Sequence, residues 1–450
     1  MKASFHTLGC KLNFSETATI QALLEKKGIL KTKGREVPDI CVVNTCSVTA
    51  TADKKARQLI RSLASKYPRA DIFVTGCYAQ LKPEEVAALP NVVAVLGSNE
   101  KLKISQFVDN WLQNKETGNP SIFNQPSNAV ANPRIVTTPS LEISEFLPSC
   151  ERGDRTRYFL KVQDGCDYFC TYCTIPFARG RSRSGSVPEL VEMARQAALN
   201  GGKEIVITGV NIGTFGKDNN QDFLSLLKAL DSVEGIERYR ISSIEPNLLT
   251  DEILNWIASE SRAFMPHFHI PLQSGSDKVL KLMNRRYDTS LFSSLIRKIK
   301  DLIPEAFIGV DIIAGARGET EPEWNRSYEF ASSLDVAKFH VFPYSERQGT
   351  KALLLEDSVP QEIRYQRVAK LNKLSESKNT AFILKNIGRE SKVLWEKSSS
   401  DGLMHGLTEN YIRVEAPLIP NLINEISLVS IESIKPGSSE IALASHLPGA

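Results

Sequence analysis

Two long stretches of this 450-residue chain alternate short apolar runs with helix-forming segments, and that alternation limits the folds open to it. Strand-like runs separated by helices predict parallel sheets covered by helices. In the first stretch we expect strands at residues 3–8, 40–45, 72–75 and 92–96, and helices at 16–26 and 53–66. Together they predict a small parallel α/β domain over residues 1–113.

The second alternation predicts an incomplete (β/α)6 barrel over residues 149–378. Its six strand-like runs are 158–162, 204–208, 238–243, 266–272, 306–313 and 338–342. One helix is well marked, because Ser186 and Glu189 form a capping box around Pro188, and Gly201-Gly202 closes the helix. A long helix is expected at 361–384. The whole chain therefore belongs to the α/β class.

Two further segments differ in composition from these domains. Residues 114–148 are polar and aperiodic, which predicts a linker. Residues 379–445 are rich in β-formers and predict a small antiparallel β-barrel. From residue 382 onward the chain has six basic and eight acidic side chains. Any RNA contact in this region must therefore be local, and Tyr411 and Arg413 are the candidates.

Composition directs attention to the eight cysteines. The net charge of +3 does not by itself indicate a nucleic-acid protein. The start of the chain lacks a secretory signal, and no apolar run reaches the roughly 18 residues of a membrane span, so we expect a cytoplasmic protein. Thiols stay reduced in that compartment, which favours metal binding or catalysis over disulfides for clustered cysteines.

Cys166, Cys170 and Cys173 follow a predicted barrel strand in the sequence DGCDYFCTYCTIP. Three thiolates on one loop can hold one corner of a [4Fe–4S] cluster, whereas a self-contained site normally uses four. The remaining iron is then free to chelate the amino and carboxylate groups of S-adenosylmethionine (SAM). A zinc knuckle is the alternative, but no nearby histidine or second cysteine pair completes it.

Cys10, Cys46 and Cys77 each follow a predicted strand of the first domain. Each would lie at the carboxyl edge of one parallel sheet, where α/β proteins bind ligands. Three thiolates there would form a second open cluster site. Lone cysteines are also commonly buried in cores, so spacing alone leaves that alternative open. Cys41 has the core pattern, and Cys150 has no evident partners.

Several long motifs resemble the methylthiotransferases of the radical SAM class. The first domain contains FHTLGCKLNFSET, VVNTCSVTATADKKARQLIR and VTGCYAQ, and the second contains GCDYFCTYCTIPFARGRSRS, EIVITGVNIGTFG, RISSIEP, HIPLQSGS and HVFPYSERQGT. The sequences of these motifs are most similar to those of the branch that modifies tRNA bearing N6-threonylcarbamoyladenosine (t6A) next to the anticodon. The likeness covers nearly the whole chain.

The resemblance implies an enzyme with two [4Fe–4S] clusters, a partner tRNA with t6A at position 37, and an RNA-binding C-terminal TRAM domain. Cys166, Cys170 and Cys173 would bind the cluster that cleaves SAM, and Cys10, Cys46 and Cys77 the auxiliary cluster. Two SAM molecules would be used per turnover, one to methylate a cluster-bound sulfur and one to make a 5′-deoxyadenosyl radical. An electron donor such as flavodoxin or ferredoxin is implied, and we expect a monomer without membrane contact.

Other substrates remain open at this stage. The same chemistry acts on a ribosomal protein in one branch and on N6-isopentenyladenosine in another, and a zinc-binding RNA scaffold without catalysis is a third alternative. The chain also departs from the family pattern, because DIIAGARGET has Ala316 and Arg317 where Phe-Pro is usual. That loop follows a predicted barrel strand, so the resemblance does not extend to its substrate contacts.

Cofactor and RNA contacts are predicted from residues near these motifs. Tyr172 is a candidate to pack on the adenine of SAM or to shield the cluster. Thr208 and Gly209 end a predicted strand and could bring backbone close to the methionine moiety. Basic runs suggest phosphate contacts, although such runs are also common on solvated faces. These basic residues are Lys54, Lys55, Arg57, Arg179, Arg181 and Arg183.

Overall fold

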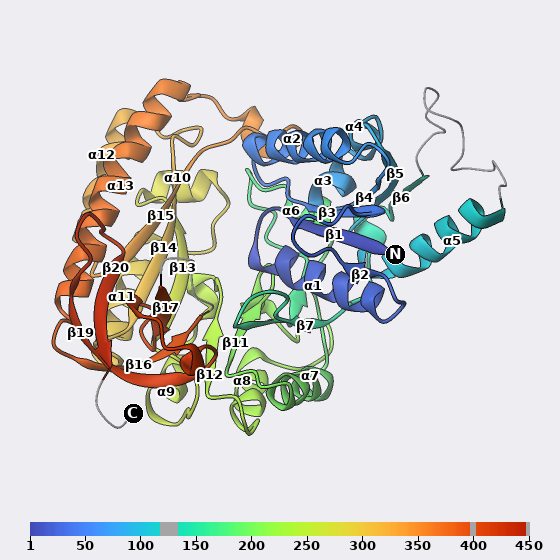
Figure 1. The fold of residues 1–450 in the computed structure, drawn as a ribbon. Coiled ribbons are helices and arrows are strands. Elements are labelled where there is room, and N and C mark those ends of the chain that lie inside the picture. Colours follow the sequence, from blue (N-terminus) through green and yellow to red (C-terminus); the bar gives the residue numbers. More distant parts are fainter. Residues whose placement is uncertain (118–133, 397–401, 447–450) are drawn as a thin grey trace.

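The computed structural model describes residues 1–117, 134–396 and 402–446, which form three structural units (Figure 1). The first unit is a parallel sheet with strand order β2-β1-β3-β4-β5-β6. Its strands are β1 Lys2–Thr7, β2 Leu30–Lys31, β3 Ile40–Thr45, β4 Asp71–Gly76, β5 Val92–Leu96 and β6 Arg134–Val136. Its helices are α1 Lys11–Glu25, α2 Ala50–Lys66, α3 Cys77–Leu81, α4 Pro83–Ala87 and α5 Ile104–Thr117.

Strand β6 lies inside the segment predicted to be a linker, which corrects that prediction in part. Its residues pair in parallel with β5 through Ala94 and Arg134. Farther along, Ile143 is buried and the Ser140 hydroxyl donates to the Phe177 carbonyl. The polar composition concealed a short edge strand, since edge strands need few apolar residues. Residues 118–133 of the predicted linker lie outside the described ranges.

The second unit is an incomplete barrel of six parallel strands. They are β8 Tyr158–Lys161, β11 Glu204–Thr208, β12 Arg238–Ile241, β13 His267–Gln273, β14 Phe307–Ala314 and β15 Lys338–Pro343. Strand β7 (Ser149–Glu151) adds antiparallel to β8, and single bridges such as Ser243 to His269 connect β12 with β13. The short pair β9 Gln163–Asp164 and β10 Arg183–Ser184 brackets the Cys166 loop.

Helices cover the outside of this barrel (Figure 1). They are α7 Val187–Leu199, α8 Phe223–Asp231, α9 Asp251–Ser259, α11 Thr289–Leu302, α12 Glu321–Ser333 and α13 Gln361–Leu384. Two short helices, α6 Ile175–Arg179 and α10 Asp277–Leu282, follow the Cys166 loop and strand β13. Ser186 is the N-cap of α7 as predicted, with its hydroxyl accepting from the Glu189 amide at 3.4 Å. Apolar side chains of strands and helices make one continuous core that includes Leu190, Ile207 and Ile308.

The third unit is a closed five-stranded barrel in the order β16-β17-β18-β20-β19. Its strands are β16 Glu390–Trp395, β17 Leu403–Thr408, β18 Arg413–Pro417, β19 Ile426–Ile434 and β20 Ile441–His446. Trp395 is fully buried at its centre. The predicted α/β architecture with a terminal β-barrel is therefore confirmed. Among the described residues, no helix has the length and apolar character needed to cross a membrane.

Helix α1 begins five residues earlier than predicted. Cys10 occupies the N-cap position but makes no side-chain capping bond. Because a cysteine is not among the preferred N-cap residues, the sequence carried no local signal for this start. The earlier start places Lys11 in the first turn of the helix, directly after Cys10.

Candidate active site

Cys10, Cys46 and Cys77 lie at the carboxyl ends of three neighbouring strands, β1, β3 and β4. Their loops pack tightly. Gly9 has φ of +101°, and a Cβ at that position would lie 2.6 Å from Cys46 Cβ and 2.8 Å from its Sγ. Only glycine therefore allows the Cys10 loop to approach Cys46 this closely. The sequence prediction that these cysteines share one sheet edge agrees with the structure.

Asn13 and Thr45 hold the three loops together. The Asn13 amide donates to the carbonyls of Leu8 at 2.9 Å and Thr45 at 3.1 Å, so it joins the loops that precede Cys10 and Cys46. The Thr45 hydroxyl donates to the Thr75 carbonyl at 2.6 Å and accepts from the Ala79 amide at 3.3 Å. It thereby fixes the start of α3, which carries Cys77.

The loop of Cys166, Cys170 and Cys173 follows β9 at the carboxyl end of the barrel. Backbone amides donate to two of its sulfurs, Tyr168 to Cys166 and Ile175 to Cys173, both at 3.4 Å. Hydrogen bonds to ligating sulfurs are typical of iron–sulfur sites and tune their potentials. The donor set therefore fits a cluster bound by three cysteines.

Two further residues, which the sequence analysis did not identify, lie beside the sulfurs of this site. Arg285 donates from Nη1 to Cys170 Sγ at 3.1 Å and also pairs with Glu245. The Asn211 amide lies 3.8 Å from Cys166 Sγ, and its buried Oδ1 has no hydrogen-bond partner among the described residues. Asn211 follows the predicted strand end at Thr208-Gly209, which is a weak sequence signal for a place near the site. Arg285 has no such signal, because it lies more than a hundred positions from the Cys170 loop.

Burial raises the pKa of Cys46 and of Cys173 to about 12. Metal ligation requires thiolates, so loading iron must release these protons. Within the described ranges, no three His, Cys, Asp or Glu side chains form a site for a single metal ion. A cubane cluster has a different requirement, because each cysteine binds a different iron.

Helix α6, directly after Cys173, connects the two cysteine sets. The Thr174 hydroxyl donates to the Ser47 carbonyl at 3.3 Å, one residue beyond Cys46. The Ser98 hydroxyl donates to the Ala178 carbonyl at 2.6 Å. Both contacts join the barrel to the first domain, so the segments that directly follow Cys46 and Cys173 lie against each other.

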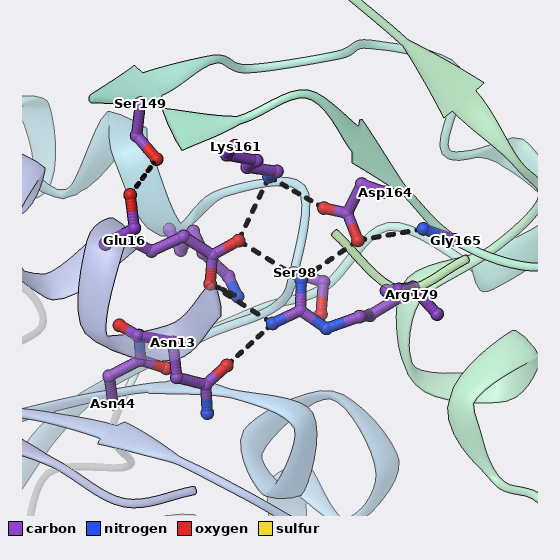
Figure 2. Close-up of polar contacts among 12 residues, drawn as sticks. Asn13, Glu16, Asn44, Ser98, Ser149, Lys161, Asp164, Gly165 and Arg179 are labelled. Atoms are coloured by element: carbon purple, nitrogen blue, oxygen red, sulfur yellow. Dashed lines mark hydrogen bonds and ion pairs between the residues drawn. The ribbon is translucent and has the colours of Figure 1, made fainter. Parts of the chain in front are cut away.

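Arg179, at the end of α6, lies in a buried charge network (Figure 2). Its guanidinium donates to Asn13 Oδ1 at 2.6 Å, to both carboxylate oxygens of Glu16 at 3.1 Å and to Asp164 at 2.9 Å. Lys101 and Lys161 also pair with Glu16, at 2.7 and 3.0 Å. Burial raises the pKa of Glu16, but these three cations outweigh that effect and hold it below its ordinary value.

The network contains more cations than carboxylates, and the charge of Arg179 acts on the Cys10 and Cys77 thiols. Positive charge at this place favours an anionic group held by the thiolates. It also corrects the prediction that Arg179 and Arg183 contact RNA. Arg179 is 1% exposed, and Arg183 is buried with its guanidinium bonded to the Arg179 and Glu145 carbonyls.

The remaining predicted RNA residues differ in exposure. Lys54, Lys55, Arg181 and Arg413 are exposed, and Arg57 is half-buried while donating to Glu85 and the Tyr78 hydroxyl, both at 2.8 Å. Their RNA contacts stay predictions. The RNA contact of Tyr411 also stays a prediction. Its ring packs 4.0 Å from that of His267 and beneath Arg240, in the interface between the two barrels.

The predicted SAM residues are also placed. Tyr172 packs against an apolar cluster that contains Met283, Ala316 and Tyr344, beside the Cys170 loop. Thr208 is buried, and a Cβ on Gly209 would lie 2.8 Å from the Gln163 carbonyl oxygen. The close approach that Gly209 allows is therefore made by Gln163. A SAM contact by any of these three residues stays a prediction.

The unusual Ala316 and Arg317 lie in the loop after β14. Ala316 is buried in the cluster that contacts Tyr172. Arg317 pairs with Glu346 at 3.0 Å and donates to the Leu355 carbonyl at 2.8 Å. This arginine thus ties the loops after β14 and β15 together at the mouth of the barrel.

Comparison with known proteins identifies the family. The model described as "Uncharacterized protein family UPF0004" matches residues 2–97, and that of the radical SAM superfamily matches residues 160–331. Threonylcarbamoyladenosine tRNA methylthiotransferase MtaB of Bacillus subtilis is 37% identical, over 96% of this chain and 94% of that protein. The chain belongs to the radical SAM methylthiotransferases. MtaB of Thermotoga maritima is 35% identical to this methylthiotransferase over 95% of the chain and 94% of that protein.

A second group of relatives carries another name. The tRNA-2-methylthio-N(6)-dimethylallyladenosine synthase of Clostridium botulinum is 32% identical to this methylthiotransferase, over 88% of the chain and 86% of that protein. Among solved structures, the radical SAM methyltransferase TsrM of Kitasatospora setae matches with a TM-score of 0.51 at 13% identity, covering 76% of this chain and 74% of that one. That likeness shows the fold alone.

Proposed function

We propose that this methylthiotransferase places a methylthio group on carbon 2 of t6A at position 37 of tRNA. The observation that carries the proposal is the pair of three-cysteine sets, joined across α6, in a chain that is 37% identical to a protein named MtaB. The dimethylallyladenosine-type relative is less similar and covers less of the chain. A ribosomal-protein substrate is kept as an outcome of the test below.

In this proposal Cys166, Cys170 and Cys173 hold one [4Fe–4S] cluster and Cys10, Cys46 and Cys77 hold the other. When bound, the first cluster and SAM supply radical chemistry, and the second holds the sulfur to be transferred. The residues of the chain position and enclose this chemistry. Arg285 and Asn211 fix two of the sulfurs, while Asn13 and Thr45 fix the opposing set.

Enclosure matters because a reactive intermediate must be kept from water and from the protein's own side chains. Tyr172 and the apolar cluster containing Met283 and Ala316 cover the barrel side of the Cys170 loop. Exposed Lys54, Lys55 and Arg181 stand near the two sets in sequence and are candidates for contacts with tRNA phosphates. A cytosolic location suits a tRNA substrate. The monomeric state and the electron donor, flavodoxin or ferredoxin, stay predictions.

Nucleosides of tRNA from a deletion strain test the substrate. We expect 2-methylthio-t6A to disappear and t6A to accumulate, with recovery on expression of the intact gene. Unchanged 2-methylthio-t6A would contradict the proposal, and loss of a ribosomal-protein modification instead would favour the alternative.

Iron analysis of the anaerobically reconstituted protein tests the two sites. We expect about eight irons per chain for two cubane clusters, and about half of that after replacing Cys10, Cys46 and Cys77 by alanine. Replacing the buried Cys41 by alanine is the matched control and should leave the iron content unchanged. An iron content that the triple variant does not lower would refute the second site.

A further inference from the structure

Three polar side chains on the inner face of the radical SAM barrel have no part in the arrangement described so far. They are His269 on β13, Asp311 on β14 and His340 on β15, and we call them the inner polar group. Val310 and Ile312, on either side of Asp311, belong to the core shared with the outer helices, so Asp311 points into the barrel. The same alternation directs the two histidines inward.

The members of the inner polar group contact one another. His269 Nε2 lies 2.6 Å from Asp311 Oδ1, and the rings of His269 and His340 stack with centroids 4.9 Å apart and planes inclined by 9°. Asp311 and His340 are also direct neighbours across the β14–β15 pair. Among the described residues, the Asp311 carboxylate makes no other hydrogen bond or ion pair, so its second oxygen is free to accept.

The inner polar group lies at the depth where the barrel interior stops being accessible. The side chains of His269 and Asp311 are 20% and 19% exposed. Closer to the amino ends of the same strands, His267 and Phe307 are buried, and the ring of Tyr411 packs against both of them. A molecule that enters from the carboxyl end would therefore reach the inner polar group and go no farther.

A short series of contacts connects the inner polar group with the Cys170 loop. Pro271 is the residue of β13 that pairs with Asp311. The Pro271 carbonyl accepts from the Tyr287 hydroxyl at 2.6 Å. Arg285 donates to that hydroxyl at 3.0 Å and to Cys170 Sγ at 3.1 Å. The inner polar group therefore lies inside the barrel mouth that carries the predicted SAM-cleaving site.

The charges of the inner polar group favour a neutral ligand that both donates and accepts hydrogen bonds. A carboxylate would be repelled by Asp311, whereas a hydroxyl can donate to the free carboxylate oxygen. Burial and the neighbouring His269 hold the pKa of His340 below its ordinary value. A neutral His340 ring can donate to the same hydroxyl from one nitrogen. Hydrogen bonds to an ionised acceptor such as Asp311 are among the stronger ones that a ligand can make.

We propose that Asp311, held by His269, binds the hydroxyl of the threonylcarbamoyl group of t6A, with His340 as its second partner. The inference rests on the function proposed above. In adenosine, the N6 substituent and the ribose lie at opposite ends of the base. Because the ribose stays attached to the tRNA outside the barrel, a base that enters the pocket does so with its N6 group leading. The threonyl arm then points toward the inner polar group, while carbon 2 stays nearer the barrel mouth.

Binding of anticodon stem-loops to the anaerobic holoenzyme tests the proposal without altering the protein. Two RNAs are compared, which carry at position 37 either t6A or its valine counterpart, in which a methyl group replaces the threonine hydroxyl. Because a hydrogen bond to a charged acceptor is lost, we expect the valine RNA to bind about tenfold or more weakly. Equal affinity for the two RNAs would overturn the proposal.

Variants of the protein supply the second arm. Asp311→Ala should bind the two RNAs with equal affinity, and Asp311→Asn should keep part of the preference because its amide oxygen still accepts. Asp301→Ala, at an exposed position of α11, is the matched control and should keep the full preference. An Asp311→Ala protein that keeps the preference but loses affinity for SAM would refute the assignment, because Asp311 would then bind a ribose hydroxyl of SAM.

The two proposals fail in distinguishable ways. If the wild type converts t6A RNA to its 2-methylthio form but binds both RNAs equally, only the Asp311 inference fails. If it makes no such product, the proposed function fails as well. Should Asp311→Ala fail to fold, the comparison of the two RNAs on the wild type still decides.

Discussion

Arg179 is the residue on which the joint between the cysteine sets most depends. Its guanidinium reaches Asn13, which braces the Cys10 and Cys46 loops, and it neutralises Glu16 and Asp164 from two different domains. A buried ion pair contributes little net stability when compared with an apolar pair, but removal of one partner leaves the other charge uncompensated. Arg179 is thus a positioning residue for the auxiliary site.

Replacing Arg179 by methionine should lower the free energy of unfolding by about 3–5 kcal/mol, because Glu16 and Asp164 lose a buried counter-ion. The loss is measured by denaturant unfolding followed by fluorescence. Iron content should fall selectively at the Cys10 set. This loss is measured by adding Arg179→Met to a protein in which Cys166, Cys170 and Cys173 have been replaced, so that only the Cys10 set can bind iron. Arg181→Met, at an exposed site on the same segment, is the control and should change neither quantity. A fully stable Arg179→Met protein with normal iron would contradict this role.

At the scale of elements, α1 performs two tasks at once. Cys10 is its N-cap, and its Phe14 and Ser15 pack on β8. The position of the auxiliary set relative to the barrel therefore depends on a helix–strand contact. A small loosening of that contact would change the geometry of the site without altering any ligand.

Replacing Phe159 by alanine should test this contact. Phe159 is 1% exposed and packs against Phe14, so its truncation should cost about 3–5 kcal/mol. In the Phe159→Ala protein, amides of α1 should exchange faster than in the wild type. Amides of α8, which lies away from the contact, should exchange at the wild-type rate. Phe342→Ala, at a site that is 46% exposed, is the matched control and should have little effect. Unchanged exchange in α1 would mean that other contacts hold the helix.

At the scale of the whole molecule, the C-terminal barrel is anchored to the radical SAM barrel by two buried arginines of β12. Arg238 donates to the carbonyls of Leu407 and Lys392 at 3.0 and 2.8 Å, and Arg240 donates to those of Thr408 and Glu409 at 2.7 and 2.8 Å. Tyr411 fills the same interface. The C-terminal unit therefore closes one end of the radical SAM barrel.

Arg238→Leu should weaken this docking by about 2–4 kcal/mol, because two charge-assisted hydrogen bonds are lost and their carbonyl acceptors stay buried. We expect limited proteolysis to cut between α13 and β16 sooner than in the wild type, while the isolated fold of each barrel persists. Arg413→Leu, on the exposed side of β18, should leave proteolysis unchanged. If RNA contacts at Arg413 are as predicted, that control should instead lower tRNA affinity. Equal cleavage of Arg238→Leu and wild type would contradict the docking role.

The sequence by itself determined the architecture and the grouping of the six cysteines. Apolar periodicity is a local property, so strands such as β3 and the helix α13 have the predicted bounds. The place of a cysteine after a parallel strand fixes the sheet edge to which it belongs, which brought Cys10, Cys46 and Cys77 together. Strand β6 was not predicted from the sequence, because an edge strand needs few apolar residues.

Only the tertiary structure decided what the charged and polar side chains do. Arg179 and Arg181 belong to the same basic run, yet one is buried between Glu16 and Asp164 and the other is exposed. Arg285 reaches Cys170 from a distant loop, and α1 begins at Lys11 without a local sequence signal. Burial and charge pairing depend on segments far apart in the chain, and no local pattern records which segments meet.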